Sequence, residues 1–403
     1  MKVYKLLPLS VLEILYRFGF PIQQFTVYHL ASLLVFPLIL LKHVKISKIV
    51  SLLIAFYLYF LINTLIHILL HITCFGDVDF YPVFRQLFGM TLGIITFIVL
   101  RSGFEINPFR SLRLVLYSLY LILLFILMFD IILNGRFYRL YGSFTEPSHL
   151  GQYLVFIVIP SILLLDNIST KRKYIMLSIT ILIILFTFSL STYIRLILFL
   201  LLYSLLGNFK EKIKYFILIL TFLILSFGTF TMLFKDSYVT VQLTKNLEFL
   251  IGGFNIENAT ASLLDRIQFL YIIKSFFESL GINAVWGIGA GLEKYYMHLL
   301  YQTELLDVIL SVKAVPSYIT SFWAKILLYG GFIGCIIFAT VLLQSVKVLM
   351  KIIDIRSRNI VLSVLLSVYI YAFFGLGPFQ SIELWFWIAF VDGYYHYYRR
   401  RAY

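Results

Sequence analysis

The sequence predicts an all-α polytopic integral membrane protein with about twelve transmembrane helices and one large loop on the outer side. The chain is 61% hydrophobic and only 13% charged, and its mean hydropathy is +0.96. Apolar runs close to the roughly 20 residues that cross a bilayer recur throughout it. A soluble protein with one core is excluded, because a 403-residue globule could not bury so many segments that are apolar on every side.

Apolar runs separated by charged or turn-forming residues define the expected helices. They lie near residues 6–20, 26–41, 49–71, 80–100, 112–133, 149–165, 174–190, 192–206, 214–234, 323–349, 358–375 and 381–397. The chain therefore divides into nine helices in residues 1–234, a large loop in residues 235–315, and three helices in residues 316–403.

Basic residues predict the orientation of these helices, since short loops rich in Lys and Arg stay in the cytoplasm. Alternate connections carry basic clusters, at residues 42–48, 101–113, 171–173, 210–214 and 347–358 among others. The short connections between them hold only Arg136 and Arg139. Both termini are therefore expected in the cytoplasm, with the loop 235–315 outside. The net charge of +14 is mostly this orientation signal, and the basic clusters are too short and scattered to predict a nucleic-acid partner.

A polar segment at residues 136–153 stands out between two apolar runs, on the outer side of the membrane. It contains Arg136, Arg139 and Glu146. Gly142 supplies a backbone conformation that other residues resist, and Pro147 favours the first turn of the following helix. Glu146 is therefore expected at the start of that helix.

Arginine is the preferred cation within the expected spans and in the short outer loops. Guanidinium binds phosphate or carboxylate through two parallel hydrogen bonds and keeps its proton, so this preference indicates an anionic ligand. The alternative is that these arginines reach lipid headgroups or pair with Glu146, Asp77 or Asp79. The candidates for substrate binding are Arg85, Arg136, Arg139 and Arg195, with Lys325 at a comparable depth.

The loop 235–315 contains two further patterns. Residues 263–280 alternate polar and apolar side chains at helical spacing, which predicts an amphipathic helix on the membrane surface. The glycines of residues 287–291 match neither a dinucleotide-binding fingerprint nor a P-loop, and we interpret them as a pliable hinge.

Possible metal ligands are sparse in the sequence. His67, His71 and Cys74 share one helix face, but structural histidines are the more common explanation of such spacing. Asp77 and Asp79 resemble the metal-binding pair of nucleotide-sugar transferases, yet they lie on the outer side, where nucleotide sugars are normally absent. We therefore predict no metal site and no cofactor.

The stretch from Arg139 to Tyr153, which reads RLYGSFTEPSHLGQY, resembles the segment before a central span in bacterial O-antigen and capsular polysaccharide polymerases and the related O-antigen ligases. Ser191–Arg195 is similar to the Ser/Thr-x-Arg start of a span in that family. Asp265-Arg266 opens the amphipathic helix, and the glycines of 287–291 precede a second glycine group at 330–334. The resemblance covers roughly residues 135–340, and the order of the motifs makes it more specific than any one of them.

The resemblance implies a metal-independent glycosyltransferase of the bacterial inner membrane. Its donor would be an oligosaccharide on undecaprenyl diphosphate, and its acceptor another such lipid-linked repeat unit. Arg195 and Arg266 would hold the diphosphate leaving group, and Glu146 would orient a sugar or accept a proton. A chain-length regulator and a flippase are the implied protein partners, and O-antigen, capsule or exopolysaccharide is the implied product.

The sequence departs from the ligases in one respect. Ligases place a histidine at the end of the outer loop, where this chain reads Val315-Pro316-Ser317-Tyr318. The nearest upstream histidine is His298, which we keep as a candidate for substrate binding together with Tyr153. This difference favours a polymerase over a ligase. A flippase or transporter is the rival of another class, although the chain lacks the related halves typical of transporters.

Overall fold

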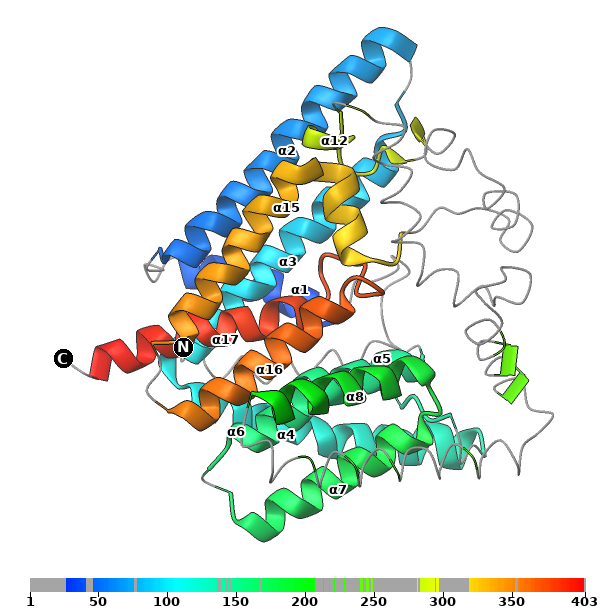
Figure 1. Ribbon diagram of the computed structural model, residues 1–403, viewed down its shortest axis with the longest axis vertical. Helices are drawn as coiled ribbons and strands as arrows, with labels where there is room; N and C mark the ends of the chain where they lie inside the picture. The colour runs from blue at the N-terminus through cyan, green and yellow to red at the C-terminus, as the bar shows by residue number, and fades with distance from the viewer. Residues whose placement is uncertain are drawn as a thin grey trace.

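The computed structural model shows a helical protein (Figure 1). The described residues are 27–40, 46–75, 78–135, 139–142, 144, 146–166, 168–206, 281, 283–293, 295–296, 319–351 and 354–401, with isolated positions between 213 and 248. Their helices are α1 (Val27–Leu40), α2 (Lys48–Phe75), α3 (Phe80–Ile106), α4 (Pro108–Phe125), η2 (Ile126–Leu133), α5 (Pro147–Tyr153), η3 (Leu154–Val158), α6 (Ile159–Leu164), α7 (Thr170–Phe186), α8 (Leu190–Leu205), α12 (Asn283–Trp286), α15 (Phe322–Leu349), α16 (Ile355–Tyr371) and α17 (Ile382–Arg401).

The expected spans that fall on described residues are all helical, either as one helix or as a series such as α4–η2 and α5–η3–α6. Five of these stretches are long and apolar enough to cross a membrane: 48–73, 80–106, 108–133, 147–164 and 322–349. Helices α1 and α8 are shorter and also apolar. The first expected span, nearly all of the ninth, and the amphipathic helix 263–280 lie outside the described residues. The chain is thus a helical membrane protein, and the total of twelve spans stays a prediction.

The helices form two groups that α16 and α17 join (Figure 1). In the first group α15 packs along α2, and α1 packs on α3. In the second group α6 contacts α4 and α7, and α5 contacts α8. Helix α17 makes its most extensive contact with α3, whereas α16 packs against α8 and α6. The C-terminal helices α15, α16 and α17 therefore pack into the N-terminal helices, and α16 and α17 connect the two groups.

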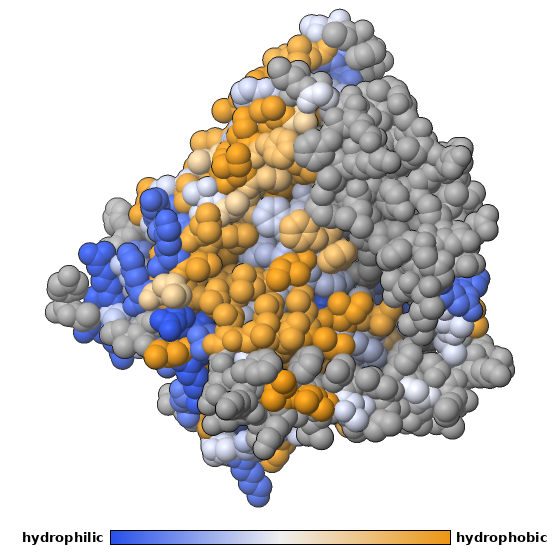
Figure 2. Space-filling view, in the orientation of Figure 1, coloured by the Kyte–Doolittle hydropathy of each residue, from blue (hydrophilic) through white to orange (hydrophobic). Residues whose placement is uncertain are grey.

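Large apolar side chains cover much of the exposed helical surface. Figure 2 shows them as a broad orange area, with hydrophilic residues gathered at the edge where α17 ends. Leu69 on α2 and Leu343 on α15 are 64% and 62% exposed. In water such a surface would drive association, whereas in a bilayer it meets lipid chains of similar polarity. The arrangement agrees with the membrane class that composition predicts.

Two π-helical segments change the course of the apolar helices. In η2, Asp130 is fully buried, and its Oδ2 accepts hydrogen bonds from the backbone N–H groups of Tyr141 at 3.0 Å and Gly142 at 2.7 Å. This carboxylate holds the turn 139–142 against the end of its own helix. In η3, the Phe156 carbonyl accepts a hydrogen bond from Nε1 of Trp387 at 2.5 Å. A π-helix alters the local backbone bonding, and such segments are frequent at functional sites.

The glycine segment 287–291 is packed and hydrogen-bonded, so its interpretation as a pliable hinge is wrong. Gly289 and Ile288 donate backbone hydrogen bonds to Tyr329 and Leu328 of α15. Gly291 has φ +80°, and a Cβ added there would lie 2.5 Å from the backbone of Val83. The segment therefore connects α15 with α2 and α3 at close range. Glycine provides close backbone approach here instead of mobility.

Candidate active site

Two of the sequence motifs named above lie against each other at the N-terminal ends of α5 and α8. The contact depends on Gly151, since a Cβ at that position would lie 2.1 Å from Oγ1 of Thr192. Only a glycine lets α8 approach this closely. The helix that follows Glu146 and the helix that carries Arg195 therefore begin side by side.

Arg195 is almost completely buried at this contact, with 3% of its surface exposed. Its Nη1 donates to the backbone carbonyl of Ser148 at 2.7 Å, and its Nη2 donates to the hydroxyl of Tyr371 at 2.9 Å. The guanidinium carbon also lies 4.2 Å from the centre of the Tyr371 ring. The arginine thus joins α8 to the start of α5 and to the end of α16.

A carboxylate and an amide complete the buried side of this site, which we call the Arg195 cluster: Glu146, Ser148, Gln152, Arg195, Tyr371 and Glu383. Glu383 is 5% exposed at the start of α17 and interacts with the Gln152 side chain and with the charge of Arg195. The sequence analysis did not select Glu383 or Tyr371. An acidic residue within the expected span 381–397 was the available signal, since ionisable groups at membrane depth are often functional.

Glu146 forms the exposed side of the cluster. It precedes α5, as the sequence predicts, and its side chain makes no capping bond to the helix. Its Oε2 instead accepts a hydrogen bond from Oγ of Ser148 at 3.1 Å. Because the Ser148 carbonyl binds Arg195, one residue connects the two predicted catalytic side chains. The cluster therefore extends from an exposed carboxylate to a buried guanidinium.

The other candidates of the polar segment are placed differently. Arg139 is exposed and takes φ +56°, beside the turn that Asp130 holds. Tyr153 is 1% exposed and packs on Phe144, with ring centres 5.7 Å apart, so it contributes to the wall behind the cluster. Three further candidates, Arg136, Arg266 and His298, lie outside the described residues.

A second charged group, the Lys325 cluster, lies where α15 meets the glycine segment: Arg85, Glu293, Lys325 and Tyr329. Lys325 is 1% exposed and lies within electrostatic reach of Glu293 and Arg85. Oη of Tyr329 donates to Oε1 of Glu293 at 3.0 Å. Glu293 follows the glycine segment directly, so the tight packing of residues 287–291 positions this carboxylate. The sequence analysis selected Arg85 and Lys325 but missed Glu293.

A third group, the Arg101 cluster, lies where the C-terminal ends of α3 and α17 meet the start of α2: Ser47, Arg101, Glu105, Asp392, His396 and Arg400. Arg101 is fully buried; its Nε contacts Oδ2 of Asp392, and its Nη1 lies 3.6 Å from Oε2 of Glu105. Ser47 donates to the same Asp392 oxygen at 2.6 Å. The sequence analysis counted Arg101 among the loop charges, and this is wrong, because the residue belongs to the buried part of α3.

The histidines of α2 lie beside the described residues 287–296. The His71 ring lies 4.9 Å from the ring of Tyr295 and 5.4 Å from that of Tyr296. His67 is 8% exposed on the same helix face. His71 therefore helps to hold the segment after Glu293 against α2, whereas His67 lies beside Gly289 of the glycine segment.

No protein-family model matches this chain, and no curated protein matches it.

Proposed function

We propose that the protein is a polymerase that joins undecaprenyl-diphosphate-linked oligosaccharide repeat units on the outer face of the bacterial inner membrane. The observation that carries this proposal is the link through Ser148 between Glu146 and Arg195. It brings two motifs of the polymerase resemblance into one polar cluster, although they are separated in the chain. A protein that only spans the membrane has no need of such a cluster.

The reaction breaks the bond between the anomeric carbon of the donor sugar and the diphosphate oxygen. A hydroxyl of the acceptor sugar supplies the new bond and loses its proton. In the proposal Glu146, which is exposed, receives that proton or orients the acceptor. Arg195 and Arg266 stabilise the negative charge that develops on the leaving diphosphate.

The buried position of Arg195 requires an exchange of its hydrogen bonds when the diphosphate binds. Its bonds to Ser148 and Tyr371 go to neutral oxygens. Bonds from a guanidinium to a phosphate oxygen are about twice as strong as bonds to neutral acceptors, so a diphosphate can replace either of them. Ser148 lies between the exposed and buried parts of the cluster, and its carbonyl is the first contact on that path.

The Lys325 cluster supports the same proposal from a second position. Lys325 lies within electrostatic reach of a second basic side chain, Arg85, and of its partner carboxylate, Glu293. A long anionic substrate such as a lipid-linked oligosaccharide diphosphate needs more than one cationic contact. We assign Arg85 to the binding of the acceptor or of the growing lipid-linked chain.

The experiment is to incubate the purified protein with a lipid-linked repeat unit and to separate the products by size. A polymerase yields a ladder of lengths and releases undecaprenyl diphosphate. A ligase yields one transfer to an added acceptor and no ladder, and a flippase moves the lipid across vesicles without forming a bond. Either of the last two results would contradict the proposal.

A variant without the proposed proton acceptor serves as the matched test. Glu146→Gln keeps the size of the side chain and the hydrogen bond from Ser148, so folding is unaffected. Asp166→Asn is the control, because it neutralises an exposed carboxylate on the cytoplasmic side. We expect the ladder to be lost with Glu146→Gln and kept with Asp166→Asn.

A further inference from the structure

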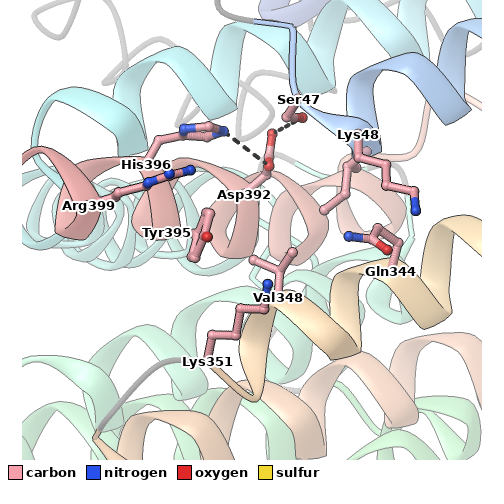
Figure 3. A pocket seen from close by; sticks show the side chains of 10 residues that line it. Ser47, Lys48, Gln344, Val348, Lys351, Asp392, Tyr395, His396 and Arg399 are labelled. Carbon is pink, nitrogen blue, oxygen red and sulfur yellow. Dashed lines mark hydrogen bonds and ion pairs between the residues drawn. The ribbon is translucent and has the colours of Figure 1, made fainter.

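A cavity of about 200 Å³ opens at the cytoplasmic side, between the start of α2 and the ends of α15 and α17 (Figure 3). Three helices from distant parts of the chain form its walls. Its lining consists of Ser47, Lys48, Ile49, Gln344, Val348, Lys351, Asp392, Tyr395, His396 and Arg399. None of these residues belongs to the Arg195 or Lys325 clusters.

Cations dominate the rim of this cavity. Lys48, Lys351 and Arg399 are all exposed, and each comes from a different helix or helix end. Figure 3 shows Lys351 and Arg399 on two sides of Tyr395, and Nζ of Lys351 lies 5.8 Å from the centre of that ring. The lining holds three basic side chains and one carboxylate, Asp392, so its exposed charge is mainly positive and favours an anionic ligand.

The carboxylate in the wall does not cancel this positive charge. Asp392 is 2% exposed, and Arg101 and Ser47 bind its Oδ2 from the side of the protein core. His396 lies 3.7 Å from the other oxygen, Oδ1. The negative charge of Asp392 is therefore matched within the Arg101 cluster. The positive charges at the rim of the cavity are therefore not balanced by Asp392.

The start of α2 adds to the attraction for an anion. Lys48 is the first residue of this 28-residue helix, and the cavity lies beside it. A helix N-terminus carries a partial positive charge and points its first N–H groups outward. Oγ of Ser47 already accepts from the N–H of Val50 at 3.1 Å, so the helix start is ordered.

Exposed apolar side chains directly precede three of the polar lining residues in the chain. Ile49 and Val348 form its buried floor. Beside the polar lining residues, Ile46 is 73% exposed, Leu343 62% and Met350 53%. A free phosphate would leave this apolar rim uncovered, whereas a lipid with a phosphate headgroup would cover it with its acyl chains.

We propose that this cavity binds the phosphate headgroup of an anionic phospholipid from the cytoplasmic leaflet. Lys48, Lys351 and Arg399 contact the phosphate, Gln344 and Tyr395 donate hydrogen bonds to the headgroup, and the acyl chains lie on Ile46, Leu343 and Met350. Basic pockets between transmembrane helices on this side of a membrane bind such headgroups. The lipid would join α2, α15 and α17, and this inference is independent of the proposed polymerase activity.

The test counts lipids bound to the purified protein by native mass spectrometry, with phosphatidylglycerol compared with phosphatidylcholine in a neutral detergent. The pocket variant is Lys351→Gln/Arg399→Gln. The control is Lys171→Gln/Arg172→Gln, which removes the same charge from exposed positions at the start of α7 on the same face. Each cation near a lipid headgroup changes affinity about fivefold, so the pocket variant should bind phosphatidylglycerol roughly thirtyfold more weakly.

Wild-type protein and the control variant should both retain phosphatidylglycerol in preference to phosphatidylcholine. Equal losses in the pocket and control variants would assign the preference to general surface charge and overturn the proposal. The single variants Lys351→Gln and Arg399→Gln, each about fivefold weaker, replace the double variant if its thermal unfolding shows that it is misfolded. Displacement of the lipid by excess inorganic phosphate would contradict the proposal that a lipid is the natural occupant, because a soluble anion would then fill the site.

Discussion

Two arginines are buried among the residues that the structure describes, Arg195 and Arg101, and they lie in clusters of opposite construction. Arg101 contacts two carboxylates, Asp392 and Glu105, which neutralise it within the protein. Arg195 donates to a backbone carbonyl and a tyrosine hydroxyl, with Glu383 nearby. Burial of a charge is costly in both places. The first cluster is complete as a structural ion pair, whereas the second contains neutral acceptors that an anionic substrate can replace.

The two clusters also lie in different parts of the fold. The Arg101 cluster holds α3 and α17 together where their contact is most extensive, and the anionic-lipid cavity lies beside it. The Arg195 cluster lies where three helices begin or end, next to an exposed carboxylate. We therefore expect substitutions in the Arg101 cluster to change stability and substitutions in the Arg195 cluster to change activity.

The largest stability effect is expected for Asp392→Ala. It leaves Arg101 buried beside Glu105 alone and removes the partner of Ser47. Loss of one member of a buried ion pair costs about 3–5 kcal/mol, and thermal unfolding of the purified protein should show a correspondingly lower Tm. Asp166→Ala is the control, since its carboxylate is 63% exposed and its ion pairs contribute at most about 1 kcal/mol.

A double variant separates the ion pair from simple loss of packing. Arg101→Met/Asp392→Leu removes both charges and keeps apolar volume, and such replacements are often neutral or stabilising. Recovery of most of the lost stability is therefore expected. A double variant as unstable as Asp392→Ala would show that this region depends on polar contacts to Ser47 and His396 instead of charge neutralisation.

The next effect concerns the glycine segment that positions Glu293 in the Lys325 cluster. Gly291→Ala adds a Cβ 2.5 Å from the Val83 backbone at φ +80°, whereas Gly281→Ala meets nothing within 4 Å at φ +51°. Backbone strain alone costs roughly 1–2 kcal/mol and applies to both variants. We expect Gly291→Ala to be destabilised by a further 1–3 kcal/mol or so through overpacking. Equal Tm values for the two variants would contradict the close contact.

A smaller effect is expected at the start of α16, outside both clusters. Partial burial opposes ionisation of Asp354, but hydrogen bonds from the Ser357 side chain and from the backbone N–H groups of Ser357 and Arg356 outweigh it and lower the pKa of this carboxyl. Asp354→Ala should cost about 1 kcal/mol at pH 7. Because the folded pKa lies below the unfolded value, this contribution is present above the unfolded pKa and disappears as the pH falls through the folded pKa.

The cap prediction is checked with Asp354→Asn, which keeps an oxygen acceptor without the charge. It should retain most of the stability at neutral pH and lose the pH dependence. If wild type and Asp354→Ala differ equally in Tm at pH 7 and below the folded pKa, ionisation of Asp354 does not contribute.

Much of the helical framework could be predicted from the sequence because apolar runs and caps are local. Residues 112–133 were expected to be one helix, and the observed start at Pro108 follows from Asn107, whose side chain accepts from the N–H of Arg110 at 3.0 Å. That cap is visible in the sequence. The π-helical course of η2 is not, since it depends on Asp130 binding a turn that comes later in the chain.

Residues of the site could be predicted only where they belong to a recognisable sequence motif. Arg195 and Glu146 stood in recognisable local patterns, and the structure connects them through Ser148. Glu383 and Glu293 were missed because their roles depend on contacts with residues on other helices, which no local sequence pattern shows. The glycine segment was misread as a hinge because its positive φ values serve contacts with α15 and α3 that no local pattern reveals.

The measurement closest to the central claim compares Arg195→Lys with Arg101→Lys for two properties, Tm and polymer length per folded protein. Lysine keeps the charge but not the paired donors of arginine. Arg195→Lys should lower polymer formation about tenfold to a hundredfold, since each bond to a charged group contributes roughly 1.5–3 kcal/mol. Tyr371→Phe removes one partner of Arg195 but keeps the guanidinium, so it should retain long polymer.

Arg101→Lys should show the reverse, with a lower Tm and long polymer from the protein that remains folded. Arg195 would then be required mainly for activity and Arg101 mainly for stability, in line with the different partners of the two side chains. Long polymer at a near-normal rate from Arg195→Lys, or its equal loss in Tyr371→Phe, would contradict the account, because Arg195 would then act only by holding helices together.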